Sequence, residues 1–197
     1  MKTHAALILI TAICQLTRPA LAQSTFAFRN FLGFGSSVDA PVFDAAGNRL
    51  SGTNYVALLY GGQTMNSLAP AINFGSGTVM PVPLTLVVAG LGGYLDGGTV
   101  QVDTLPCGGL AWLQVRAWDA RLGATYGDVV KLGLGGYGES NLFQDPGGNP
   151  CYPITPPGFL LGLQSFSLLP EVPEPGSLSL LVFGSAALLF LRRGARR

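Results

Sequence analysis

Histidine is almost absent from this chain of 197 residues, because the one copy, His4, lies close to the N-terminus. Histidine is the side chain whose ordinary pKa suits acid–base catalysis at neutral pH, and its imidazole is the commonest metal ligand. Residues 23–170 therefore hold no Ser-His-Asp or Cys-His nucleophile pair and no imidazole metal site. Cysteine is scarce too, with three copies in the whole chain. Two of them remain after residue 22, too few for a zinc site of four thiolates.

Charge is also low, since Asp, Glu, Lys and Arg make up 11% of the residues while 48% are hydrophobic. This composition excludes a charged disordered chain, which combines high charge with low hydrophobicity. Residues 24–170 carry five basic and eight acidic side chains, a net charge of −3. A mildly acidic domain has no electrostatic attraction for nucleic acid, so no nucleic-acid partner is expected. The acids show no distinctive pairing of the kind that a glycosidase needs, and we expect no enzymatic activity.

The first 22 residues have the parts of a secretory signal peptide. A positively charged start precedes an apolar run over residues 5–14. Ala20 and Ala22 then place small residues three positions and one position before a cut at Gln23. We expect signal peptidase to remove residues 1–22 and the remaining chain to be exported.

The C-terminal end combines a short motif, an apolar run and a basic cluster. The motif is Pro173-Glu174-Pro175, and the run over 177–191 contains no charge. As a helix these fifteen residues would reach about 22 Å, and arginines extending to the interface make up part of the difference from a ~30 Å hydrocarbon core. Basic residues on one flank predict a cytoplasmic tail and a transmembrane helix over 177–191 in the inner membrane. The cluster consists of Arg192, Arg193, Arg196 and Arg197.

This three-part end resembles the PEP-CTERM sorting signal of Gram-negative envelope proteins, here over residues 171–197. The resemblance implies that an exosortase, an integral membrane enzyme with a cysteine nucleophile, reads Pro173, Glu174 and Pro175. It further implies that the exported part passes to the cell envelope or the extracellular matrix. The middle of the chain is also similar to one group of PEP-CTERM proteins, for which no biochemical activity is established. That similarity covers residues 40–44, 50–53, 114–120 and 162–168.

Residues 23–170 predict an all-β domain. Thr99–Thr104 and Ala111–Trp118 alternate with period two, which places Val100 and Val102, and Leu113, Val115 and Ala117, on inner faces. Many short strands separated by Gly, Asp and Asn turns favour a β-sandwich of the jelly-roll or immunoglobulin-like kind. One short helix is expected over 126–132, ended by Gly133. The other predicted strands are Phe26–Phe31, Tyr55–Tyr60, Leu84–Val88, Asn141–Gln144 and Phe159–Leu168.

Cys107 and Cys151 are the two thiols that remain after signal-peptide removal. An even count in an oxidising compartment predicts a disulfide between them, closing a loop of about 45 residues. The alternative is two free thiols, because sequence does not give the distance between them.

Trp112, Gln114, Arg116 and Trp118 share the strand face opposite the inner residues. An exposed row of tryptophans with polar neighbours would stack on the sugar rings of an exopolysaccharide. The favoured explanation is structural: a second buried face, or Arg116 lying against a tryptophan as a cation–π pair.

Two loop patterns resemble ligand sites without matching them. Residues 133–138 spell Gly-x-Gly-x-x-Gly, but no helix follows, so we interpret them as a glycine-rich loop and not a dinucleotide site. Residues 44–48 and 145–149 offer oxygens for Ca²⁺ but lack the alternating acids and closing Glu of an EF-hand. Turn chemistry explains them, and we expect neither a metal nor a cofactor.

The sequence thus predicts a non-catalytic exported envelope or matrix protein, sorted by an exosortase through its C-terminal signal. The alternative is a carbohydrate-binding module for extracellular polysaccharide, based on Trp112, Arg116 and Trp118. The expected partners are signal peptidase, the exosortase and the inner membrane, with exopolysaccharide as the ligand of the alternative.

Overall fold

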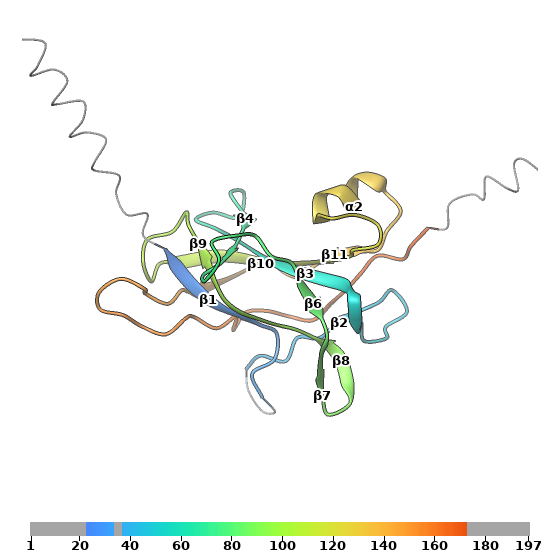
Figure 1. Cartoon of the computed structure of the whole chain (residues 1–197), viewed down its shortest axis with the longest axis horizontal. Helices are drawn as coiled ribbons and strands as arrows, with labels where there is room; N and C mark the ends of the chain where they lie inside the picture. Colours follow the sequence, from blue (N-terminus) through green and yellow to red (C-terminus); the bar gives the residue numbers. More distant parts are fainter. Residues whose placement is uncertain (1–22, 34–36, 173–197) are drawn as a thin grey trace, which may run out of the picture.

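The computed structural model describes residues 23–33 and 37–172 (Figure 1). This part of the chain is mostly β-strand with one short helix, which confirms the all-β prediction. Among the residues described, no helix is long and apolar enough to cross a bilayer. The expected signal peptide (1–22), the motif beginning at Pro173 and the apolar run over 177–191 lie outside the described residues.

The largest sheet is built on two long antiparallel strands, β3 (Gly52–Gly62) and β10 (Leu110–Asp119). They pair in continuous register from Trp112 opposite Gly62 to Asp119 opposite Tyr55. Shorter strands complete the six-stranded sheet, two along the far edge of β10 and two along β3. These are β11 (Tyr137–Glu139), β12 (Phe143–Pro146), β4 (Ala69–Pro70) and β6 (Val82–Leu84).

A second sheet has three antiparallel strands in the order β1–β9–β5. Two further pairs stand apart from it: β7 and β8 form a hairpin, and β13 runs parallel to β2. The parallel pair brings the C-terminal part of the domain beside its N-terminal part. The bounds are β1 (Ser24–Arg29), β9 (Asp96–Val102), β5 (Ile72–Asn73), β7 (Leu86–Val88), β8 (Leu91–Tyr94), β2 (Val42–Phe43) and β13 (Phe166–Ser167).

One apolar core joins the two sheets. Leu113, Val115 and Ala117 on β10 are buried, as their alternation predicts, and they belong to the same cluster as Val100 and Val102 on β9. The inner faces of both sheets therefore meet in one core, which the burial of apolar area stabilises. The cluster also includes Phe26, Phe28, Leu59, Leu84, Leu95 and Leu160.

The single described helix matches its prediction. Helix α2 (Tyr126–Leu132) begins at Thr125, whose side chain accepts a hydrogen bond from the amide of Asp128. It ends at Gly133, where φ is +69°, a left-handed conformation that glycine adopts without steric cost. The helix buries Tyr126 and Val129 and packs against β10 and β11 on the side away from the main core.

Two predicted strands were wrong in extent. Leu84–Val88 is not one strand, because Leu84 pairs with β3 and Leu86 with β8. Phe159–Leu168 is largely irregular, although Leu160 and Leu163 are buried. Side chains from elsewhere satisfy its backbone in place of a β-ladder. Asn141 bonds Gly162 O and Gln164 N at 3.0 Å each, and Asp145 accepts from Gly162 N at 3.0 Å.

Candidate functional site

The outer face of β10 carries the residues proposed for a glycan site, and these residues differ in how exposed they are. Trp118 is only 1% exposed, because α2 covers it. Its ring meets Tyr126 edge-on, with centroids 6.3 Å apart, and its indole N–H donates to Gly123 O at 3.1 Å. Trp118 therefore offers no ring face to a sugar, so the exposed row of the glycan alternative does not form and the favoured explanation, a second buried face, holds at this residue. Trp112, at the other end of the strand, is partly exposed beside Gly62 and Gln144.

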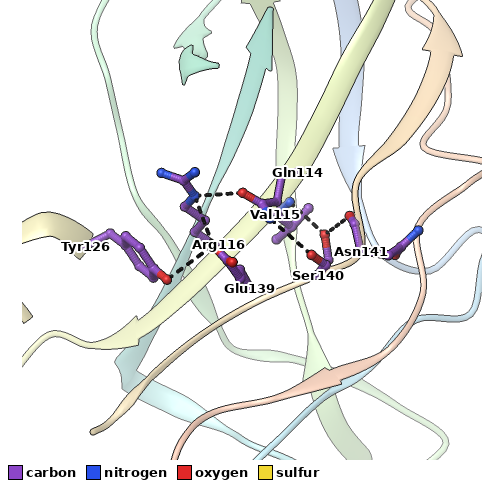
Figure 2. Close-up of polar contacts among 7 residues, drawn as sticks. All are labelled: Gln114, Val115, Arg116, Tyr126, Glu139, Ser140 and Asn141. Carbon is purple, nitrogen blue, oxygen red and sulfur yellow. Dashed lines mark hydrogen bonds and ion pairs between the residues drawn. The ribbon is translucent and has the colours of Figure 1, made fainter. Parts of the chain in front are cut away.

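Arg116 lies against tyrosines, whereas the sequence suggested a tryptophan. Its guanidinium carbon is 4.3 Å from the ring centroid of Tyr60 and 5.3 Å from that of Tyr126. Its Nε donates to Gln114 Oε1 at 2.9 Å and lies 3.6 Å from Glu139 Oε2 (Figure 2). These contacts hold the arginine over the sheet, between β3 and α2. The cation–π explanation of this residue is thus correct in kind and wrong in partner.

The polar groups around Arg116 are tied to the neighbouring strand and loop. Ser140 accepts from the amide of Val115 at 3.0 Å and donates to Asn141 O at 2.8 Å, and its carbonyl accepts from Gln114 at 3.2 Å (Figure 2). The hydrogen bond to the Ser140 carbonyl therefore orients Gln114, whose side-chain oxygen accepts from Arg116. This network leaves the arginine partly exposed, with 26% of its side chain accessible.

An aromatic cleft opens beside this network. It has a volume of about 330 Å³ and lies between α2, β3 and the loop that precedes β6. Burial raises the pKa of the Tyr126 hydroxyl to about 12, and the negative charge of Glu139 adds to the effect. Burial also raises the pKa of Tyr60. Both hydroxyls are therefore neutral at physiological pH and serve as hydrogen-bonding groups, not as acids or bases. The lining residues are Leu58, Tyr60, Pro70, Val79, Pro81, Trp118, Ala124, Thr125 and Tyr126.

Most acidic residues within the described part of the chain have structural partners, and the exception is Asp103, whose buried Oδ1 accepts no hydrogen bond. Burial alone would raise the pKa of Asp119, but the hydrogen bonds from Arg121 outweigh it and lower that pKa. Asp44 accepts from the side-chain amide of Asn48 and from the backbone amides of Asn48 and Ala46 in a tight turn, and these hydrogen bonds lower its pKa. The structure brings together no three His, Cys, Asp or Glu side chains able to hold a metal ion in its described residues.

Cys107 and Cys151 form a disulfide pair. Their Cα atoms are 6.0 Å apart, inside the range of natural disulfides, although 44 positions separate them in sequence. The two cysteines lie at disulfide distance, as the predicted pairing requires, which favours it over the alternative of two free thiols. The bridge joins the loop after β9 to the loop after β12, at the margin of the core.

The segment leading to the proposed sorting motif is hydrogen-bonded to the folded domain as far as Val172. Leu169 N donates to Tyr137 O at 2.8 Å, and Val172 N donates to Leu134 O at 2.7 Å. Gly135 and Gly136 have φ of +82° and +72°, and a Cβ on Gly135 would overlap the carbonyl oxygen of Pro170. The Gly-x-Gly-x-x-Gly pattern therefore serves close backbone approach, not a dinucleotide.

Replacing Gly135 with alanine should release this C-terminal segment. The added Cβ meets backbone atoms, which cannot move aside as a flexible side chain would. We expect the amides of Leu169 and Val172 to lose hydrogen-exchange protection by more than tenfold, a change of about 1.4 kcal/mol in local opening. Gly133→Ala is the matched control, because Gly133 also has a positive φ but has open space around it. Equal exchange rates in the two variants would contradict the close-approach argument.

Two groups of predicted site residues lie outside the described residues. They are the motif Pro173, Glu174 and Pro175 and the cluster Arg192, Arg193, Arg196 and Arg197. Sequence reasoning missed Tyr60, Tyr126 and Glu139 around Arg116. No signal in the chain links them, because they come from three different elements.

Comparison with known proteins finds no relative for this chain. No protein-family model matches it, no curated protein matches it, and no solved structure matches it. Function therefore has to be inferred from the residues and their placement.

Proposed function

We propose that this chain is a non-catalytic protein of the bacterial cell envelope, exported and then sorted by an exosortase through residues 171–197. The observation that carries the proposal is the pairing of Cys107 with Cys151. Stable disulfides form outside the reducing cytoplasm, so the pair supports export, as the signal peptide expected over 1–22 does. The sorting step rests on the resemblance of the C-terminal end.

The placement of the polar residues supports a role without catalysis. Asp119 is buried against Arg121, and Asp145 is buried with its carboxylate accepting from Gly162 N. Tyr94, which bonds Asp39 and Arg49, belongs to another such structural group. These side chains are engaged in hydrogen bonds that stabilise loops, which is a structural use of their polar groups.

We further propose that the exported domain is a β-sandwich of the jelly-roll or immunoglobulin-like kind. Its support is the common apolar core between the β1–β9–β5 sheet and the inner face of the β3–β10 sheet. Two sheets that share one core are the defining feature of that architecture.

The sorting proposal is tested by replacing Pro173, Glu174 and Pro175 together with alanine. Export should stay intact, because the signal peptide is unchanged, while removal of the C-terminal tail should stop. Mass spectrometry of the C-terminal peptide in envelope and medium fractions measures the result. A control with the exposed Gln164 and Ser165 changed to alanine should be processed normally. Normal loss of the tail from the triple variant would refute the assignment.

A carbohydrate-binding module is the second candidate, and the aromatic cleft beside Arg116 is the observation that favours it. Tyr60 and Tyr126 line the cleft, and the partly exposed guanidinium of Arg116 contacts both rings, with its Nε 3.6 Å from the carboxylate of Glu139. Saccharides use such mixtures of apolar ring faces and hydrogen-bonding groups. The proposed subsite is thus the cleft with Tyr60, Arg116 and Tyr126, in place of the row that included Trp118.

A further inference from the structure

We infer that the domain rests on the lipid bilayer through the outer side of α2 and the adjoining C-terminal segment. This membrane-facing patch is defined by Val130, Lys131, Leu132, Leu169 and Val172. The inference rests on the proposed membrane anchoring of residues 177–191, and it assigns the surface of the domain that contacts lipid.

The patch is apolar and open to solvent. Val130 is 37% exposed, Leu132 and Leu169 are each 50% exposed, and Val172 is 58% exposed. Each of these side chains leaves water if it enters the lipid. Every Å² of apolar surface removed from water in this way favours binding by about 25 cal/mol. Exposed apolar side chains gathered in one place mark an interaction surface more strongly than scattered ones.

The members of the patch belong to one region of the fold. Residues 133–136 connect α2 to β11, and this connection bonds the C-terminal segment through Val172 N to Leu134 O and Gly136 N to Leu169 O, at 2.7 and 3.0 Å. In Figure 1 the yellow helix α2 and the red end of the described chain lie on the same side of the molecule. The patch therefore lies on the side of the domain from which the chain continues toward residue 177.

The length of the connection to the expected membrane span fixes how far the patch can be from the bilayer. Only residues 173–176 separate Val172 from Ser177. Five Cα steps cover at most about 18 Å when fully extended. The headgroup zone takes up roughly 5–8 Å of that distance on each side of the hydrocarbon core. Val172 thus lies within about 13 Å of the headgroup surface. This distance is shorter than the ~15 Å radius of gyration of a 150-residue domain, so the side of the domain that holds Val172 is the side nearest the bilayer.

The charges around the patch cancel. Lys131 is exposed in the last turn of α2. Glu171 Oε1 lies 4.0 Å from Nη2 of Arg121, but the same guanidinium also pairs with the buried Asp119. The two acids and the two basic side chains therefore sum to no net charge, and the exposed apolar side chains carry the inference.

The test uses the exported chain with its complete tail and with Pro173, Glu174 and Pro175 replaced by alanine to prevent processing. A genetically encoded fluorescent amino acid replaces Leu132, or, as matched control, Ile154. Ile154 is 77% exposed and lies on the 149–158 loop, at the opposite end of the molecule in Figure 1. The protein is reconstituted into vesicles of phosphatidylethanolamine and phosphatidylglycerol with brominated acyl chains, which quench fluorophores near the membrane.

We expect protein that floats with the vesicles to show several-fold stronger quenching at position 132 than at position 154. Flotation with equal quenching at the two positions, strong or weak, would overturn the assignment of the patch while leaving the anchoring intact. Failure to float would refute the anchoring itself, and the patch with it. Circular dichroism of each labelled protein confirms that the fold is retained.

Discussion

Replacing Trp118 with alanine should lower the free energy of unfolding by about 3–5 kcal/mol, the usual cost of truncating a fully buried large aromatic residue. Trp118 is 1% exposed, packs edge-on against Tyr126 and uses its indole N–H to hold Gly123 O. Alanine would leave a cavity beneath α2 and an unpaired carbonyl at the start of the loop to the helix. The contact between the Trp118 and Tyr126 rings, which joins β10 to α2, would be lost.

Trp112→Ala is the matched control, because Trp112 lies on the same face of the same strand but is partly exposed. Its cost should be well below that of Trp118→Ala in urea denaturation followed by circular dichroism. Equal costs would show that burial does not separate the two positions. Because the Trp112 variant keeps the fold, it also tests the original glycan face: unchanged retention on an immobilised exopolysaccharide would remove Trp112 from that site.

Local patterns predicted β10, β9 and α2 because each is long or strongly patterned enough to set its own structure. Period-two alternation from Ala111 to Trp118 gives both the strand and its inner face. The helix was equally readable, with Gly133 as its stop signal. The strand predicted over Phe159–Leu168 was wrong because apolar content indicates burial but not backbone geometry. The amides of Gln164 and Gly162 donate to the side chains of Asn141 and Asp145, which alternation does not reveal.

The sequence predicted which face of β10 carries the candidate site, but not which elements pack on that face. Periodicity placed Arg116 and Trp118 opposite the main core, and it said nothing of what packs on that face. Helix α2 covers Trp118 and supplies Tyr126, while β3 supplies Tyr60. These contacts depend on how three elements pair in space, so the partner of Arg116 was out of reach of local reasoning.

The cysteine pair was accessible to sequence for a different reason. Residues 23–170 contain two cysteines, so only one pairing is possible between them, and the count pointed to that pair. The end of the domain was not accessible, because docking of Leu169 and Val172 depends on the positive-φ glycines at 135 and 136. A run of glycines without a following helix is the signal that, in hindsight, points to close backbone approach.

Cys107→Ser should lower the free energy of unfolding by up to about 4 kcal/mol, because the bridge closes a loop of 44 positions and restricts the unfolded chain. For a domain of this size that loss corresponds to a fall of about 10 °C in Tm. Cys151 is exposed, so its freed thiol should react readily with a thiol probe. Differential scanning calorimetry and probe incorporation measure the two effects.

The double variant Cys107→Ser/Cys151→Ser separates the bridge from the individual side chains. If the bridge carries the stability, removing the second cysteine adds little, since the constraint on the unfolded chain is already gone. The double variant should therefore melt within a degree or two of the single one, given that about 1 kcal/mol shifts Tm by 2–4 °C in domains of this size. Additive losses would assign the effect to local packing of each residue. Reaction of both cysteines with the probe in the oxidised native protein, without denaturant, would show that the bridge does not form in solution.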